Sequence, residues 1–251
     1  MLASLLLAVT LAAEPGPAFA FSDADGKRLL SLGPVGVPAR LTRASCDGRV
    51  VDVAFLSQQP KGAKDTGRQT AANFDQVSGA LYEVKGDAVP PDAPCLLADG
   101  AFFRVSLPVA VTASQKPCDA KASAAVTRLN KRKVERCLEV GAFPGGRLVL
   151  VTFARSGKAL LVGLVLLAEK VTAMRSFPAT FEPGAPSCWR VDDGCVFEPG
   201  AYHVPFVLAG PSGPTPFGLW DGAEGQNLEL LEVRGAALEG GLTASRYWSP
   251  L

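Results

Sequence analysis

The only histidine of the chain, His203, limits the catalytic mechanisms that the sequence can support. A Ser-His-Asp triad, a Cys-His pair or a histidine-bound metal ion would each depend on this imidazole. The G-x-S-x-G motif that presents a nucleophilic serine in many hydrolases is absent from the sequence. Residues 202–208 alternate as a strand, which puts His203 opposite the face that carries Tyr202 and Phe206. We therefore expect a surface histidine or one held by a structural hydrogen bond, and a catalytic role is the alternative.

Asp192 and Asp193 are the other candidates for catalysis, because glycosidases use two carboxylates as acid and base. The two aspartates precede a glycine, and this combination is typical of a turn. A secreted hydrolase that uses His203 or this aspartate pair is the alternative function. We expect no cofactor and no metal site, because zinc ligands occur in closely spaced pairs and the nearest cysteines, Cys188 and Cys195, are further apart.

Two groups of side chains are candidates for ligand binding. The basic residues Lys131, Arg132 and Arg136 could attract an anionic ligand, although a solvated charged face is the simpler interpretation. This cluster lacks the interleaved aromatic residues that stack on nucleic-acid bases. Trp189 and Trp220 could contact a glycan or a partner protein, but tryptophan more often lies in a core.

The N-terminus has the composition of a secretory signal peptide. Residues 1–13 are apolar and uncharged, and they are too few to cross a bilayer, which takes about 20 residues. We predict cleavage near Ala13, with Ala20 as the alternative, and a buried N-terminal helix is the competing interpretation. The mature protein is then expected to be secreted or periplasmic. We expect no membrane span in it, because charged residues interrupt the only later apolar stretch of sufficient length.

The six cysteines agree with export, because disulfides persist in oxidising compartments. If residues 119–140 formed one helix, Cys118 and Cys137 would lie about 28 Å apart. A disulfide needs Cα atoms within about 7 Å, so a bridge between them requires a short helix and a returning strand. Among the fifteen pairings that six cysteines allow, we predict the three sequential ones. These are Cys46–Cys95, Cys118–Cys137 and Cys188–Cys195.

The apolar pattern predicts a mainly β protein of the α+β class with antiparallel sheets. A short helix at residues 119–131, capped by Asp119, packs on a β-meander at residues 133–177. A longer helix would put Lys133 on the apolar face. The meander contains two runs that are apolar at nearly every position, which is typical of strands covered on both faces. Residues 103–111 alternate as a further strand.

The predicted organisation is a main β-rich domain at residues 14–180 and a C-terminal β subdomain at residues 188–251, either separate or part of the same domain. Lys and Arg (25) nearly equal Asp and Glu (24) in number, which argues against a nucleic-acid partner. No convergent set of catalytic residues stands out. The leading hypothesis is therefore a non-enzymatic envelope or extracellular module that binds an unknown protein or glycan partner.

Overall fold

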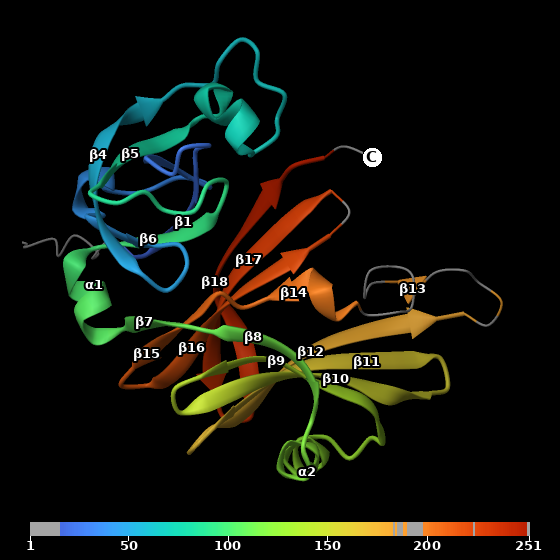
Figure 1. Ribbon diagram of the computed structural model, residues 1–251. Helices are drawn as coiled ribbons and strands as arrows, with labels where there is room; N and C mark the ends of the chain where they lie inside the picture. Colours follow the sequence, from blue (N-terminus) through green and yellow to red (C-terminus); the bar gives the residue numbers. More distant parts are fainter. Residues whose placement is uncertain (1–15, 183, 185–187, 190–197, 223, 250–251) are drawn as a thin grey trace, which may run out of the picture.

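A computed structural model describes residues 16–182, 184, 188–189, 198–222 and 224–249 of the chain. The protein is built mainly from antiparallel β-strands with few helices, as predicted (Figure 1). A six-stranded barrel at residues 18–98 is followed by a second, larger β structure. The N-terminal signal peptide predicted at residues 1–13 lies outside the described residues.

The barrel closes through the hydrogen bonding of its first and last strands. Its strands follow one another in the order β1 (Ala18–Ser22), β2 (Arg28–Ser31), β5 (Gly79–Lys85), β4 (Val50–Gln59), β3 (Arg43–Ser45) and β6 (Pro94–Ala98). Side chains alternate across each strand, so Ala80, Tyr82 and Val84 of β5 lie inside. The 3-10 helices η1 (Pro38–Arg40) and η2 (Ala71–Gln76) lie in the connections. The interior of the barrel is thus a packed core.

The larger β structure is one sheet whose two end strands are consecutive in the chain. Its strand order is β7 (Leu107–Ala110), β15 (Phe206–Gly210), β16 (Gly213–Asp221), β17 (Gly225–Arg234), β18 (Ala237–Tyr247), β12 (Thr172–Phe181), β11 (Ala159–Ala168), β10 (Gly146–Ser156), β9 (Val134–Phe143) and β8 (Thr112–Pro117). Two short strands, β13 (Cys188–Trp189) and β14 (Tyr202–His203), pair with β12 and β16. Only one parallel pair, Met174 with Ala237, joins β12 to β18. The sheet therefore folds over into two facing halves around a shared core.

The strands β10 and β11 are covered on both faces, which explains their continuous apolar sequences. Leu148 and Leu150 face the core between the two halves of the sheet. Val149 and Val151 face the other way, against helix α2 (Ala120–Leu129). Burying a side chain such as Val126 of α2 contributes about 1.5–3 kcal/mol to stability. The short helix and the meander of residues 133–177 are confirmed.

The strand predicted at residues 103–111 is wrong in its first half. Residues Gly100–Val105 form helix α1, because the side chain of Asp99 caps it by accepting a hydrogen bond from the backbone N–H of Phe102 at 2.7 Å. Val105 and Leu107 are 62% and 56% exposed, so they do not belong to one buried face. The strand β7 begins only at Leu107.

The barrel packs on the outer face of the sheet half that contains β15, β16 and β17. The rings of Phe19 and Phe217 stack with centroids 5.4 Å apart within a shared apolar cluster. Arg246 of β18 is only 3% exposed and donates a hydrogen bond from Nη1 to the carbonyl of Asp92 at 2.7 Å. Its Nε donates to the carbonyl of Gln69 at 2.5 Å, and its guanidinium also pairs with the Asp92 carboxylate. Apolar contacts and this arginine together fix the barrel against the sheet.

Two of the predicted disulfides are confirmed. Cys46 and Cys95 join the barrel strands with Cα atoms 4.0 Å apart, and Cys118 and Cys137 join the start of α2 to β9 with Cα atoms 5.4 Å apart. The predicted Cys188–Cys195 bridge involves Cys195, which lies outside the described residues. None of the helices in the described ranges is long and apolar enough to cross a membrane.

Candidate functional site

A cleft opens where two neighbouring strands separate. The strand β7 pairs with β15. Directly after β7, the backbone N–H of Val111 donates a hydrogen bond to the carbonyl of Pro205, the residue before β15, at 3.0 Å. Beyond this bond β8 turns to pair with β9, whereas β14 pairs with β16. The two strands diverge, and the space between them forms a cleft of about 270 Å³.

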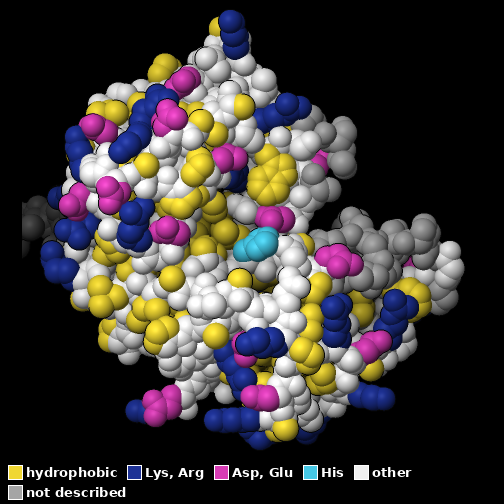
Figure 2. Space-filling model, viewed as in Figure 1, with side chains coloured by type: hydrophobic (Ala, Val, Ile, Leu, Met, Phe, Trp, Pro, Cys, Tyr) yellow, Lys and Arg dark blue, Asp and Glu magenta, His cyan; other side chains and the backbone are white. Residues whose placement is uncertain are grey.

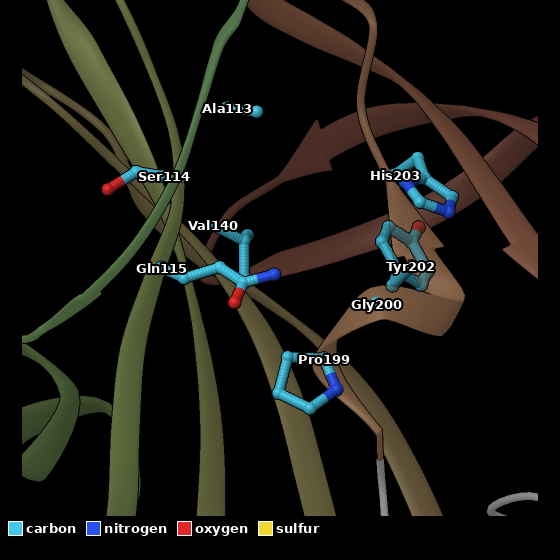
Figure 3. A pocket seen from close by; sticks show the side chains of 8 residues that line it. All are labelled: Ala113, Ser114, Gln115, Val140, Pro199, Gly200, Tyr202 and His203. Atoms are coloured by element: carbon cyan, nitrogen blue, oxygen red, sulfur yellow. The ribbon is translucent and has the colours of Figure 1, made fainter.

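This β8–β14 cleft is lined by residues from both strands, from β9 and from the 3-10 helix η3 (Pro199–Ala201) that precedes β14. The lining residues are Ala113, Ser114, Gln115, Val140, Pro199, Gly200, Tyr202 and His203. Figure 3 shows the side chain of Gln115 reaching from the β8 wall toward the β14 wall. The hydroxyl of Ser114 points away from the cleft in the same view.

His203 lines this cleft and is held by a carboxylate. Its Nε2 lies 3.0 Å from Oδ2 of Asp221, the last residue of β16, and Gln226 donates to the other oxygen of Asp221 at 2.6 Å. The hydrogen bond to Asp221 raises the pKa of His203, although burial acts in the opposite direction. The His203 side chain is 50% exposed, and Figure 2 shows the histidine (cyan) at the surface beside carboxylates (magenta).

The Asp221 carboxylate stays ionised at neutral pH in this arrangement. Burial raises its pKa, but hydrogen bonds from His203 and Gln226 and the charges of His203 and Arg246 outweigh burial and lower it overall. The pair thus consists of an ionised carboxylate and an imidazole that is protonated more readily than a histidine without such a partner. The prediction of a histidine opposite the apolar face of its strand agrees with this position.

Tyr202 forms a rigid wall of the cleft. It is buried, and its ring lies 5.7 Å from the ring of Phe177 and 5.8 Å from that of Trp220. Its hydroxyl donates to Oε1 of Glu229 at 3.2 Å, and Glu229 pairs with Arg175 at 3.1 Å. Burial, together with the charge of Glu229, raises the pKa of Tyr202 well above its ordinary value. The hydroxyl therefore stays protonated and engaged inside the protein.

Among the described residues, no nucleophilic side chain is hydrogen-bonded to His203, as a hydrolase triad would require. The only side-chain partner of His203 among the described residues is Asp221. The Ser114 oxygen is buried without a hydrogen-bond partner, but it points away from the imidazole. The His203–Asp221 pair can accept and release one proton, and it can donate hydrogen bonds to a bound molecule.

The basic residues predicted as an anion site lie elsewhere. Arg132 donates from Nη2 to the carbonyls of Ala154 and Ala159, at 2.8 and 2.9 Å, and so ties the β10–β11 hairpin to the chain before β9. Lys131 and Arg136 are exposed, and neither lines the cleft. The three therefore do not form one site with His203.

The remaining predicted residues are distributed as follows. Trp220 lies in β16, half-buried, with its ring 4.7 Å from that of Phe177. Trp189 belongs to β13 beside Thr180, and its side chain is not described. Asp192 and Asp193 lie outside the described residues. Of the predicted candidates whose side chains the structure describes, only His203 lines the cleft.

Asp221, Gln226 and Gln115 contribute to the site but were not predicted. Asp221 meets His203 through the pairing of β14 with β16, a contact between strands that no local spacing reveals. Within the described ranges, no group of three or more His, Cys, Asp or Glu side chains is placed to hold a metal ion. Comparison with protein families, curated proteins and solved structures finds no match to this chain.

Proposed function

We propose that the protein is an exported, non-enzymatic module that binds a partner in the β8–β14 cleft. The observation that carries this proposal is the cleft itself. Its walls include two diverging strands, and the exposed titratable group among its described lining residues, His203, is hydrogen-bonded to Asp221 and to no nucleophile in the described part of the chain. Such a site is suited to recognition by hydrogen bonds.

Two features support export to the periplasm or the medium. Disulfides such as Cys46–Cys95 and Cys118–Cys137 persist where the environment is oxidising. The first barrel strand begins at Ala18, and Phe19 is buried. Cleavage near Ala13 would leave the barrel complete, whereas cleavage after Ala20 would remove more than half of β1.

A hydrolase that uses His203 is the second candidate, because a histidine oriented by a carboxylate can act as a general base. The two candidates differ in what they require of the imidazole. A catalytic His203 would be needed for turnover of a bound molecule, so His203→Gln would abolish turnover but retain binding. A binding module shows no turnover in the wild type.

A variant that fills the cleft tests the binding proposal. A Cβ added at Gly200, which lines the cleft, meets no atom within 4 Å and needs no unusual backbone angle, so we expect Gly200→Trp to fold and to obstruct the cleft. Gly36 in the barrel is equally open, so Gly36→Trp is the matched control. We expect wild type and Gly36→Trp to capture the same component from the cell envelope or medium. Capture by Gly200→Trp as well would contradict the proposal.

A further inference from the structure

We propose that the ligand of the β8–β14 cleft is an extended peptide segment of a partner protein, which adds to β8 as an extra strand. This inference rests on the proposed function and specifies its ligand class. It is carried by the free edges of the two strands that form the walls.

Among the strands that the structure describes, β8 is at the end of the sheet and pairs with β9 alone. Its pairing with β9 is regular at Ala113 and again at Lys116, and the register shift between them is a bulge that puts Ser114 and Gln115 opposite the single residue Val140. Ala113, Ser114 and Gln115 are the β8 residues that line the cleft. An unpaired strand edge presents a row of backbone N–H and C=O groups to any chain that approaches.

The opposite wall, β14, also pairs on only one side within the described ranges. Tyr202 and His203 pair with Trp220 and Leu219 of β16 on one side, and on the other side they line the cleft. The hydrogen bond from Val111 to Pro205 closes the end of the cleft where the two walls meet. A peptide inserted from the open end would continue the strand pairing that stops at this bond. β-Strand addition to a sheet edge is a recurring mode of peptide recognition.

The lining residues favour a peptide over a glycan or an anion. Sugar rings stack on exposed aromatic faces, but the ring of Tyr202 is buried and packed against Phe177 and Trp220. No lysine or arginine is among the described lining residues, so they offer a phosphate or sulfate ester no positive charge besides the His203 imidazole. Backbone edges and a flexible amide such as Gln115 instead match the alternating donors and acceptors of a peptide.

His203 adds a charged contact that a peptide can use. Because Nε2 is engaged by Asp221, the imidazole presents its Nδ1 edge to a ligand. The protonated imidazole donates from Nδ1, which suits a peptide carbonyl or a carboxylate. Peptides with an acidic residue or a free C-terminus near His203 should therefore bind best at mildly acidic pH.

A random peptide library tests this inference on the full, oxidised chain. The probe is a displayed library of peptides about ten residues long, the upper end of ordinary strand lengths. Enriched peptides are then synthesised, and their affinities are measured for wild type, Gly200→Trp and the control Gly36→Trp. Hydrogen–deuterium exchange of the complex locates the bound segment.

We expect binding to wild type and Gly36→Trp, at least tenfold weaker binding to Gly200→Trp, and slower amide exchange at residues 113–116. N-methylation of the peptide at amides that face β8 should weaken binding about tenfold each, and methylation of the intervening amides should have less effect, because strand hydrogen bonds alternate.

Three results would overturn the inference: enriched peptides that bind Gly200→Trp as well as wild type, protection elsewhere in the chain, or methylation effects without alternation. A library that yields no peptide, combined with a glycan-array signal that Gly200→Trp removes, would overturn the peptide ligand and retain the cleft as the binding site. A native component captured equally by Gly200→Trp would overturn the proposed function itself.

Discussion

Replacement of Arg246 by methionine removes a buried charge that connects the barrel to the sheet. The arginine side chain is 2% exposed, and its partner Asp92 is 48% exposed. Methionine keeps a chain of similar length near the ring of Phe21, over which the guanidinium lies at 4.9 Å. The substitution thus removes mainly the polar contacts to Asp92 and Gln69.

The expected loss of stability follows from those contacts. Hydrogen bonds from a charged donor contribute about 1.5–3 kcal/mol each, and Arg246 makes two to backbone carbonyls, of Asp92 and Gln69. Removing one partner of a buried ion pair costs about 3–5 kcal/mol, but the half-exposed Asp92 carboxylate can regain water. We therefore expect Arg246→Met to lower the free energy of unfolding by about 3 kcal/mol.

Urea unfolding with two probes measures this effect, with the disulfides kept oxidised. All three tryptophans, Trp189, Trp220 and Trp248, lie outside the barrel, so fluorescence reports on the larger β structure while circular dichroism reports on both parts. In the wild type the two transitions should coincide, and in Arg246→Met they should separate.

The matched control is Arg234→Met, which removes an exposed arginine from the neighbouring strand β17. Surface ion pairs contribute about 0–1 kcal/mol, so this variant should shift the midpoint little. If Arg246→Met lost no more stability than Arg234→Met, the buried arginine would not hold the two parts together.

Three further predictions concern single side chains. Asp221→Asn should return the pKa of His203 toward about 6.5, which NMR of the single imidazole can follow. Because the wild-type pKa is raised, the pair stabilises the fold fully below about pH 6.5, and this stabilisation is lost as the pH rises through the pKa of His203 in the folded protein. Gly218→Ala should destabilise the protein by about 1–3 kcal/mol, because the new Cβ would lie 2.3 Å from the Tyr202 hydroxyl, and urea unfolding measures the loss. Asp119, whose pKa is lowered to about 2 by the Arg147 hydrogen bond, stabilises the fold above about pH 4 and loses this effect as pH falls toward 2; the difference in urea midpoint between wild type and Asp119→Asn should therefore vanish at low pH.

The prediction from sequence was most accurate where a single residue was incompatible with the alternative secondary structure. Lys133 on the apolar face of a long helix pointed to a short helix and a returning strand, and the Cys118–Cys137 bridge confirms that turn of the chain. The error at residues 103–111 had the opposite cause, because an alternating pattern continued across a boundary between helix and strand. The helix begins at the cap Asp99 and ends at the cap Ser106, whose backbone N–H donates to the carbonyl of Phe102, and the strand starts only after that residue.

The barrel and the cleft depend on contacts between distant residues, so local patterns did not reveal them. Closure of the barrel needs β1 to pair with β6, which joins Phe19 to Leu96. The alternation around His203 predicted its exposed face correctly, but it carried no information on Asp221, which reaches His203 only after β16 has folded back beside β14. The local sequence pattern predicts on which face of a strand a side chain lies. The residue that it contacts there depends on how the strands pair in the sheet.

The contact that joins the two parts of the protein also acts on the charge at the cleft. Gln226, which holds Asp221, pairs across the strands with Arg246. The positive charge of Arg246 helps to lower the pKa of Asp221, and the ionised Asp221 in turn raises the pKa of His203. In Arg246→Met the pKa of Asp221 should therefore rise, even where the sheet stays folded. The pKa of His203 should not fall, because Asp221 is still ionised where the imidazole titrates and the variant has lost a positive charge. The arginine that holds the barrel thus also helps to keep the carboxylate beside His203 ionised as the pH falls.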